Sequence, residues 1–402
     1  MKIGFLAHDF LTWQGGADFL DIVLRSVFAT GRSAESVLLL PVRGPRIILR
    51  SLRLSLRAWL RDSAPRTWKW IPPMAQYHRS GLQTLPQSVR RVFIDVGNVP
   101  LLRAARRHRL NVVLPAVHPL GVDFPVPWVG YAYDFQHRHL PEFFTCQDRH
   151  SRDRHFKRMF HEAKAVLVNS RSVKEDALRF VDHISANIFT LPFTPVLRPE
   201  WRHGDKAALE KWGLQMNIPF FLVSNQFWKH KNHALAFRAA RVLRARNLKF
   251  QLVCTGSWET EETRQVVRSL RKEFSQEIST GIIRLTGWIP KEDQISLIHF
   301  ARAILQPSLF EGGPGGGIVY HAYALGRPIL LSDLPVNREI PLDESCYFPA
   351  KDELALADRM AACLATDPSA ALPWKFLEKK SRASLQKCGE VIFEAMETVI
   401  QR

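Results

Sequence analysis

The sequence predicts two α/β domains, each built on a doubly wound parallel sheet, and three observations point to this fold class. Short apolar runs alternate with segments of helical periodicity along most of the 402 residues. The alternation stops at a proline-rich stretch, 191–199, and then starts again. A chain of this length also accommodates two domains. We therefore expect an N-terminal domain over 1–195, a C-terminal domain over 205–370, and a last helix over 371–402 that packs back on the N-terminal domain.

In the N-terminal half, the expected strands are apolar runs bounded by polar residues. They lie at 2–7, 37–41, 91–95, 111–115, 128–133 and 164–168. A helix is expected over 17–28, because Phe19, Ile22, Val23 and Val27 recur on one face. Ser172 and Glu175 have the spacing of a capping box, which predicts that a helix starts there and runs through Phe180.

The C-terminal half repeats the pattern. Strands are expected at 220–224, 250–255, 282–286, 303–306 and 328–332, and helices at 233–246, 290–300 and 318–325. Ligands of such sheets bind beyond the carboxyl ends of the strands. We therefore expect the functional site in a central cleft between the two domains.

Composition excludes several classes of protein. The five cysteines form no Cys-x-x-Cys pair, which is typical of a reducing cytosol and argues against a disulfide framework or a zinc ribbon. No apolar run approaches the roughly 20 residues of a membrane span, and His8-Asp9 interrupts the N-terminal apolar run too early for a signal peptide. We expect a cytoplasmic protein without a bound metal or cofactor.

Positive charge is concentrated in the first half of the chain. Residues 1–195 hold 28 Lys and Arg against 15 Asp and Glu, a net +13, whereas residues 196–402 hold 28 against 23, a net +5. One stripe recurs at helical spacing without intervening acids: Arg46, Arg50, Arg53, Arg57 and Arg61. Its three interpretations are an ordinary solvated helix face, a helix on an anionic membrane and a nucleic-acid-binding surface. The third keeps a basic nucleic-acid-binding protein as an alternative function. No nucleic-acid partner is expected, because no RNA- or DNA-binding signature accompanies the charge.

Two loops carry the chemistry. At 305–317 a strand leads into a loop in which five glycines surround one proline, Pro314, and the loop opens a helix. Uncovered backbone N–H groups at the positive end of a helix form a phosphate site; the alternative is a flexible surface loop. At 224–233, Lys229 and Lys231 follow the first strand of the second domain, where a lysine could neutralise a diphosphate. The alternative there is a solvated loop.

Together these stretches resemble glycosyltransferase family 4, whose members are retaining enzymes of the GT-B fold. The matching motifs are Lys231-Asn232, Gly287-Trp288-Ile289, Pro307-Ser308-Leu309-Phe310-Glu311-Gly312, Gly326-Arg327-Pro328 and Ser332-Asp333. The N-terminal half is similar more loosely, through a Gly15-Gly16 loop before the first helix and through Asp134-Phe135-Gln136-His137.

The resemblance implies a nucleotide-diphosphate sugar as donor and no metal. By position, Lys231 would meet the diphosphate, Glu311 the sugar hydroxyls, and the backbone amides of Gly315, Gly316 and Gly317 the distal phosphate. Trp288 and Ile289 would face the base, and Gly15 and Gly16 would approach phosphate or acceptor. The implied reaction is retaining transfer of a sugar to a hydroxyl of a lipid-linked or oligosaccharide acceptor. Together with the basic half, this suggests polysaccharide or lipopolysaccharide assembly at the inner face of the cytoplasmic membrane.

The chain departs from the family pattern at two positions. Gln226 stands where the family usually has an arginine, and Val319 where it has a second glutamate. Counting back from Gly326 places His321 at that second position instead. These departures keep open a non-catalytic protein that binds nucleotide sugars.

The loop at 134–137 has two interpretations. Asp134 and His137 are expected at the cleft-facing end of the N-terminal domain. His137 is interpreted either as a buried turn histidine or as a polar contact to sugar or acceptor. The histidine that is usual in the family aligns imperfectly, and could instead fall at Tyr133.

Overall fold

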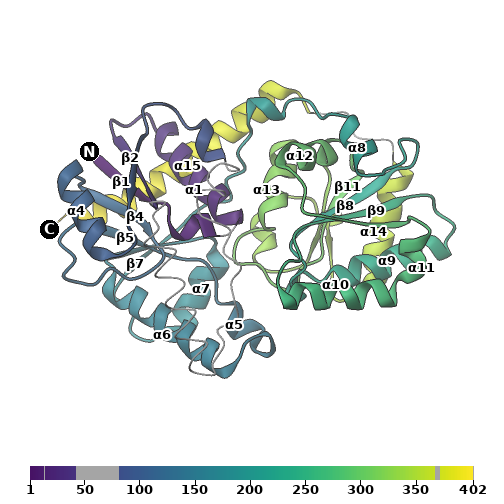
Figure 1. Ribbon diagram of the computed structural model, residues 1–402, viewed down its shortest axis with the longest axis horizontal. Coiled ribbons are helices and arrows are strands. Elements are labelled where there is room, and N and C mark those ends of the chain that lie inside the picture. The colour runs from purple at the N-terminus through teal and green to yellow at the C-terminus, as the bar shows by residue number, and fades with distance from the viewer. Residues whose placement is uncertain (13, 42–80, 367–371, 402) are drawn as a thin grey trace.

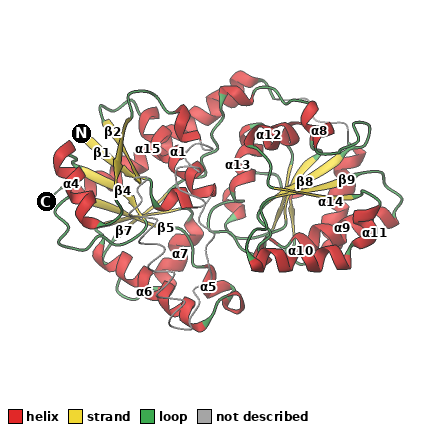
Figure 2. Cartoon of the chain, in the orientation of Figure 1, coloured by secondary structure: helices red, strands yellow, loops and turns green. Residues whose placement is uncertain are grey.

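The computed structural model describes residues 1–12, 14–41, 81–366 and 372–401, and they form two domains side by side (Figures 1 and 2). Each domain has a parallel sheet with helices on both faces. Strands covered on both faces are apolar throughout, which is why they were recognisable as short apolar runs. The predicted fold class is confirmed. The arginine stripe from Arg46 to Arg61 lies outside the described residues.

The N-terminal sheet has the strand order β3-β2-β1-β4-β5-β6-β7. Its strands are β1 (Lys2–Leu6), β2 (Glu35–Pro41), β3 (Arg90–Ile94), β4 (Val112–Ala116), β5 (Trp128–Ala132), β6 (Ala165–Val168) and β7 (Asn187–Thr190). Its helices are α1 (Gln14–Ala29), α4 (Asn98–His108), α5 (Gln136–His139), α6 (Cys146–Glu162) and α7 (Arg171–Phe180). The order reverses between β1 and β4, and sheets of this kind bind their ligands beyond the carboxyl ends of the strands at such a reversal.

The C-terminal sheet has the order β10-β9-β8-β11-β12-β13. Its strands are β8 (Phe220–Ser224), β9 (Gln251–Thr255), β10 (Ile283–Gly287), β11 (Ala303–Gln306), β12 (Ile329–Ser332) and β13 (Tyr347–Phe348). Its helices are α8 (Ala207–Lys211), α9 (His233–Ala245), α10 (Glu261–Glu273), α11 (Ser275–Ser279), α12 (Lys291–Phe300), α13 (Gly317–Ala324) and α14 (Glu353–Ala365). The order again reverses, here between β8 and β11.

The last helix, α15 (Trp374–Ile400), lies against α1 of the N-terminal domain (Figure 1). Phe393 and Met396 are buried in the same core as the N-terminal strands. Arg32, beyond the end of α1, pairs with Glu390 and Glu397 of α15 at 2.7 Å each. The chain thus returns to its first domain after completing its second.

One helix start differs from the prediction. The N-cap of α7 is Ser170, whose hydroxyl accepts the N–H of Val173 at 3.1 Å, and not Ser172. The hydroxyl of Ser172 instead donates to Glu339 of the other domain at 3.2 Å. The Ser172 side chain therefore makes a tertiary contact, although the local sequence pattern predicted that it caps the helix.

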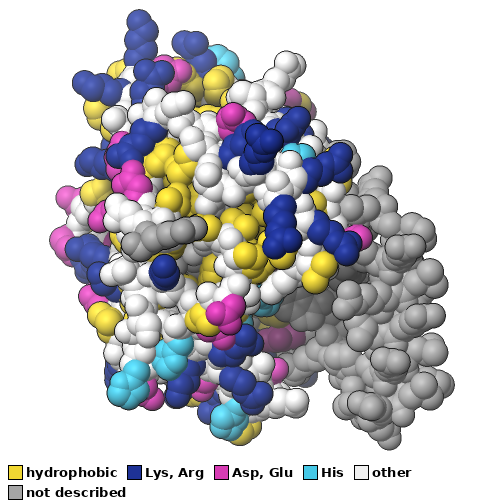
Figure 3. All heavy atoms as spheres, turned by 90° about the vertical axis from the view of Figure 1, so that its left-hand side faces the viewer, with side chains coloured by type: hydrophobic (Ala, Val, Ile, Leu, Met, Phe, Trp, Pro, Cys, Tyr) yellow, Lys and Arg dark blue, Asp and Glu magenta, His cyan; other side chains and the backbone are white. Residues whose placement is uncertain are grey.

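Basic side chains are spread over the surface of the N-terminal domain that faces away from the other domain (Figure 3). On this face, Lys and Arg alternate with acidic and apolar side chains and are not gathered in one patch. Within the described ranges, no helix is both long and apolar enough to cross a membrane.

Candidate functional site

The loops that follow β8 and β11 bring Lys231 and Glu311 together. Lys231 ends the short 3-10 helix η5 (Lys229–Lys231), and Glu311 lies in the loop after β11. The Nζ atom of Lys231 is 2.6 Å from Oε1 and 2.8 Å from Oε2 of Glu311. Their side chains are only 15% and 7% exposed. The two residues expected to bind donor phosphate and donor sugar are thus adjacent and partly shielded from water.

Two amide side chains hold the Glu311 carboxylate in place. Gln306, the last residue of β11, donates from Nε2 to Glu311 Oε1 at 2.7 Å. Asn225, the first residue after β8, donates to Gln306 Oε1 at 2.9 Å. Neither residue was among the predicted site residues, although both stand at carboxyl ends of predicted strands, where polar side chains line such sites.

The glycine-rich loop is ordered by a buried asparagine. Gly315 donates its N–H to Oδ1 of Asn337 at 2.8 Å, and Asn337 is fully buried. Gly315 and Gly316 adopt φ of +68° and +70°, which favours glycine at both positions. The N–H of Gly315 is therefore already hydrogen-bonded within the protein, whereas the sequence predicted that the amides of Gly315, Gly316 and Gly317 would all bind phosphate. Among the described residues, none accepts the N–H of Gly316 or Gly317 at the start of α13, so these two amides are available to an anion.

The same loop touches the N-terminal domain at Gly312. A Cβ on Gly312 would lie 2.5 Å from the carbonyl oxygen of Tyr133 and 2.7 Å from Cβ of Asp134. Ser170 Oγ also donates to the Gly312 carbonyl at 3.0 Å. Asp134 accepts Arg152 Nη2 at 2.7 Å, so its carboxylate is paired at the domain interface. Asp134 therefore lies beside the glycine loop, as its predicted position requires.

His137 lies apart from this interface, within the N-terminal domain. Its side chain is fully buried between Phe135 and Phe156, and its Nε2 is 2.8 Å from Asp153 Oδ1. Burial lowers the pKa of His137, so the ring is neutral at neutral pH. This environment favours the interpretation of a buried turn histidine over a contact to sugar or acceptor.

His321 belongs to a second cluster that crosses the interface. Lys291 at the start of α12 donates to Asp18 of α1 at 3.1 Å, and His321 Nε2 lies 3.8 Å from the same Asp18 oxygen. Burial, followed by the charge of Lys291, lowers the pKa of His321 to about 3. Burial alone would raise the pKa of Asp18, but Lys291 and His321 lower it. His321 is 7% exposed and its edge meets the Trp201 ring, so it faces Asp18 and Trp201.

The remaining residues that were predicted to contact the donor differ in their exposure to solvent. Gly15 and Gly16 form the first turn of α1, next to Asp18. Trp288 is 43% exposed, whereas Ile289 is 5% exposed and packs in the C-terminal core. Gln226 is exposed and its Oε1 accepts the indole N–H of Trp228 at 2.8 Å. The Trp288 side chain is thus partly exposed to solvent, and the Ile289 side chain is not.

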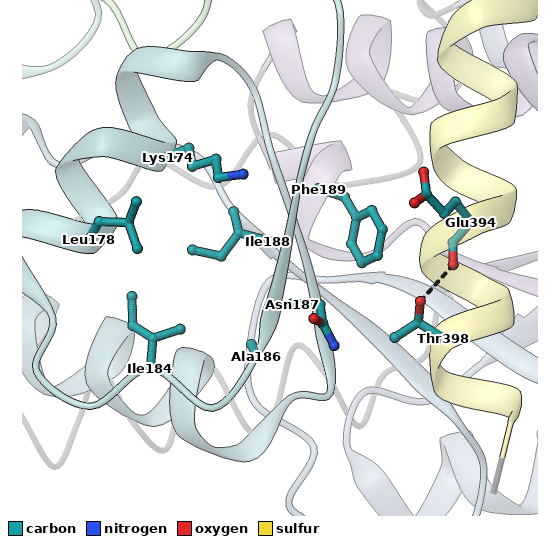
Figure 4. Close-up of a pocket in the computed structure, with 9 residues that line it drawn as sticks. All are labelled: Lys174, Leu178, Ile184, Ala186, Asn187, Ile188, Phe189, Glu394 and Thr398. Carbon is teal, nitrogen blue, oxygen red and sulfur yellow. Dashed lines mark hydrogen bonds between the residues drawn. The ribbon is translucent and has the colours of Figure 1, made fainter.

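A cavity of about 540 Å³ lies elsewhere, at the edge strand β7 between α7 and α15 (Figure 4). Lys174, Leu178 and Ile188 lie on one side of the strand, and Phe189 and Glu394 on the other. It contains none of the predicted site residues. Over the described ranges, no group of three or more His, Cys, Asp or Glu side chains is arranged to hold a metal ion.

One known family matches the C-terminal domain. Residues 219–366 match the family model "Glycosyl transferases group 1". The match includes Lys231, Glu311 and the whole glycine loop. The C-terminal domain is thus similar to group 1 glycosyltransferases. The resemblance to family 4 glycosyltransferases is thereby confirmed.

A curated relative extends this similarity over part of the chain. O-antigen chain mannosyltransferase B of Escherichia coli is 24% identical over 240 residues, which are 57% of this chain. The matched region spans 60% of that mannosyltransferase.

Solved structures extend the similarity to the fold of the whole chain. Sucrose-phosphate synthase from Thermosynechococcus elongatus has a TM-score of 0.64 at 14% identity, covering 100% of this chain and 95% of its own. HepE of Anabaena, solved with UDP and glucose, has a TM-score of 0.59 at 13% identity, covering 100% of this chain and 97% of its own. WaaG, a glycosyltransferase involved in lipopolysaccharide biosynthesis, has 0.56 at 13%, covering 100% of both chains. At these identities the likeness establishes the fold, which is GT-B.

Proposed function

We propose that the protein is a retaining glycosyltransferase that moves a sugar from a nucleotide-diphosphate sugar to an acceptor hydroxyl. The observation that carries the proposal is the pairing of Lys231 with Glu311 at 2.6 Å beside the glycine loop. A cation, a carboxylate and two available amides at the start of a helix are the groups that a sugar diphosphate needs. The family of the C-terminal domain supports the same reaction.

Donor binding requires the Lys231–Glu311 pair to separate. Lys231 would move onto the diphosphate, and the Glu311 carboxylate would accept sugar hydroxyls while Gln306 still holds it at 2.7 Å. The Gly316 and Gly317 amides at the start of α13 would take the distal phosphate. The developing negative charge on the leaving diphosphate is then stabilised by fixed dipoles and by one cation. A leaving phosphate oxygen takes the acceptor proton, so no strong protein base is needed.

The nature of the donor is supported by the structural relatives. HepE was solved with UDP and glucose, and its fold covers this whole chain. A nucleoside diphosphate sugar is therefore the donor class that we propose. Trp288, 43% exposed at the carboxyl end of β10, would stack on the base.

The acceptor that we propose is a lipid-linked or oligosaccharide acceptor of cell-surface polysaccharide assembly. An O-antigen mannosyltransferase and a lipopolysaccharide glycosyltransferase are among the similar proteins. The net charge of +13 in residues 1–195 and the arginine stripe would hold the protein at an anionic membrane face.

A thermal-shift panel with UDP, GDP, ADP, CMP and dTDP tests the donor site. A ligand at about 100 times its dissociation constant stabilises a protein by about 2.7 kcal/mol. A clear thermal shift with one nucleotide supports the cleft site and identifies the base. The absence of a shift with all five nucleotides contradicts the site. Release of that nucleoside diphosphate from its sugar conjugates then distinguishes an enzyme from a non-catalytic binding protein, the alternative that Gln226 keeps open.

A further inference from the structure

The N-terminus of α7 and a 3-10 turn of the opposite domain form one concentrated contact. The turn is η6 (Asn337–Glu339), which follows β12. The carboxylate of Glu339 accepts the backbone N–H of Arg171 and of Ser172, each at 3.0 Å, and the hydroxyl of Ser172 at 3.2 Å. In all three bonds the N-terminal domain donates and the C-terminal domain accepts.

The chemistry of this contact favours a closed arrangement of the domains. Glu339 is 12% exposed, so its charge is partly removed from water. The negative charge of Glu339 is stabilised by the first N–H groups of α7. These groups have no partner inside their own helix and lie at the positive end of its dipole. Hydrogen bonds to an ionised group are about twice as strong as neutral ones. When the domains separate, Glu339 and the start of α7 would both return to water.

The same turn also holds the glycine loop. Asn337, two residues before Glu339, accepts the N–H of Gly315 at 2.8 Å and is fully buried. Its own amide donates to the carbonyl of Ser332 at 2.8 Å, which ties the turn to the end of β12. Gly312 at the other end of the loop accepts the hydroxyl of Ser170, the N-cap of α7. Loop and turn therefore contact α7 at two adjacent points.

We propose that Glu339 is a positioning residue that couples closure of the two domains to the order of the glycine loop. It contacts no predicted donor atom and acts through α7 and through the turn that it shares with Asn337. The inference rests on the proposed function, because the loop is the part of the donor site that it positions. In the closed state, the loop is pressed against Asp134 and its free amides are fixed for phosphate.

Amide hydrogen exchange of the ligand-free, full-length protein tests the coupling directly. The variant is Glu339→Gln, which keeps the shape and one acceptor but removes the charge. The matched control is Glu344→Gln. Glu344 is 82% exposed, and among the described residues it pairs only with Arg338, which lies next to Glu339 in η6. In E339Q we expect exchange about tenfold faster in peptides covering both 170–174 and 312–317. Peptides from β1 and β8 should be unchanged, and E344Q should match the wild type.

Three outcomes would overturn the proposal. Unchanged exchange at 170–174 would show that the carboxylate does not hold α7. Faster exchange confined to 170–174, with 312–317 as in the wild type, would show a contact without coupling. Faster exchange throughout the chain would show a general loss of stability.

A second measurement separates this inference from the proposed function. UDP, GDP and ADP, each at millimolar concentration, are titrated against wild type, E339Q and E344Q. Weaker binding of the same nucleotide to E339Q alone, by about tenfold, supports coupling to the donor site. Equal affinity for all three proteins overturns that coupling. If no nucleotide binds the wild type, the proposed function fails, whereas the exchange experiment still decides whether Glu339 joins α7 to the loop.

Discussion

Lys231 and Glu311 neutralise each other before any donor is present, with Nζ 2.6 Å from Oε1. Each charge would otherwise be left unpaired in a partly buried site, which is costly. The pair therefore stabilises the ligand-free protein. Because the proposed function also gives these two residues to the donor, we expect mutations to affect both stability and turnover.

The first prediction is a double-mutant cycle on this pair. Lys231→Met and Glu311→Gln should each lower the free energy of unfolding by about 2 kcal/mol, because each leaves its partner uncompensated. The double variant should be less destabilised than the sum of the two, since neither charge remains. Urea denaturation measures the stabilities, and nucleoside diphosphate release should fall by about 100-fold or more in both single variants. Additive stabilities would contradict the pairing.

A second prediction concerns the closest approach of the two domains. Gly312→Ala would place a Cβ 2.5 Å from the Tyr133 carbonyl oxygen, so the glycine loop must move away from the N-terminal domain. We expect turnover to fall by about tenfold or more, because small displacements of reacting groups are costly. Gly313→Ala is the matched control, since its Cβ would meet Asn169 at an ordinary 3.5 Å. An equal loss of turnover in both variants would mean that the contact at Gly312 does not matter.

The sequence predicted most of the fold because both sheets are covered by helices and most of their strands are largely apolar. It missed β7, an edge strand of only four residues that are exposed or half-buried, which leaves no apolar run to detect. Ser172 was assigned to capping because local spacing cannot reveal that Glu339, 167 residues away, binds it.

The candidate site likewise contains residues that could be predicted from the sequence and residues that could not. Lys231 and Glu311 lie in motifs with a fixed order along the chain, and the sequence was sufficient to name them. Asn337 and Glu339 follow a different strand, and only the folded sheet brings their turn beside the glycine loop. His321 aligned with a family position, but its environment of Asp18 and Trp201 depends on α1 and on the linker.

The third prediction tests how α15 is held on the first domain. Gly389 of α15 lies so close to α1 that a Cβ there would overlap the carbonyl oxygen of Ser26. Gly389→Ala should lower the free energy of unfolding by about 1–3 kcal/mol through overpacking, and the midpoint of thermal unfolding should fall accordingly. Ser384→Ala is the control, because Ser384 is half-buried on the same helix and, within the described residues, its hydroxyl donates only to the Lys380 carbonyl. An unchanged midpoint in G389A would contradict the close packing of α1 and α15.

Membrane association can be tested with vesicles. Reversing three charges of the stripe, in Arg50→Glu, Arg53→Glu and Arg57→Glu together, should abolish preferential sedimentation with anionic over neutral vesicles at low salt. Each basic residue near an anionic surface contributes about 1 kcal/mol. The control reverses three exposed charges of α4: Arg103, Arg106 and Arg107. Equal binding of the wild type to anionic and neutral vesicles would overturn the membrane proposal, and equal losses in both triple variants would assign binding to net charge instead of the stripe.

The last prediction is a pH dependence of stability that originates at His321. Its pKa is lowered from 6.5 to about 3 by burial and by Lys291, so the folded protein keeps the ring neutral where the unfolded chain protonates it. The unfolded state then binds more protons below pH 6.5, and stability that is fully present above that pH is lost as the pH falls toward 3. Asp18 acts in the same direction, because its pKa is lowered despite burial and its pairing with Lys291 is lost when it is protonated.

The loss from His321 alone should be about 1–2 kcal/mol between neutral pH and pH 5. His321→Gln removes the titrating ring, so its unfolding free energy should fall less over that interval than that of the wild type. His203→Gln, at an exposed histidine near the same domain boundary, should keep the wild-type slope. Urea denaturation at several pH values measures the slopes. Identical slopes for the wild type and H321Q would show that the histidine does not remain neutral beside Asp18 and Lys291.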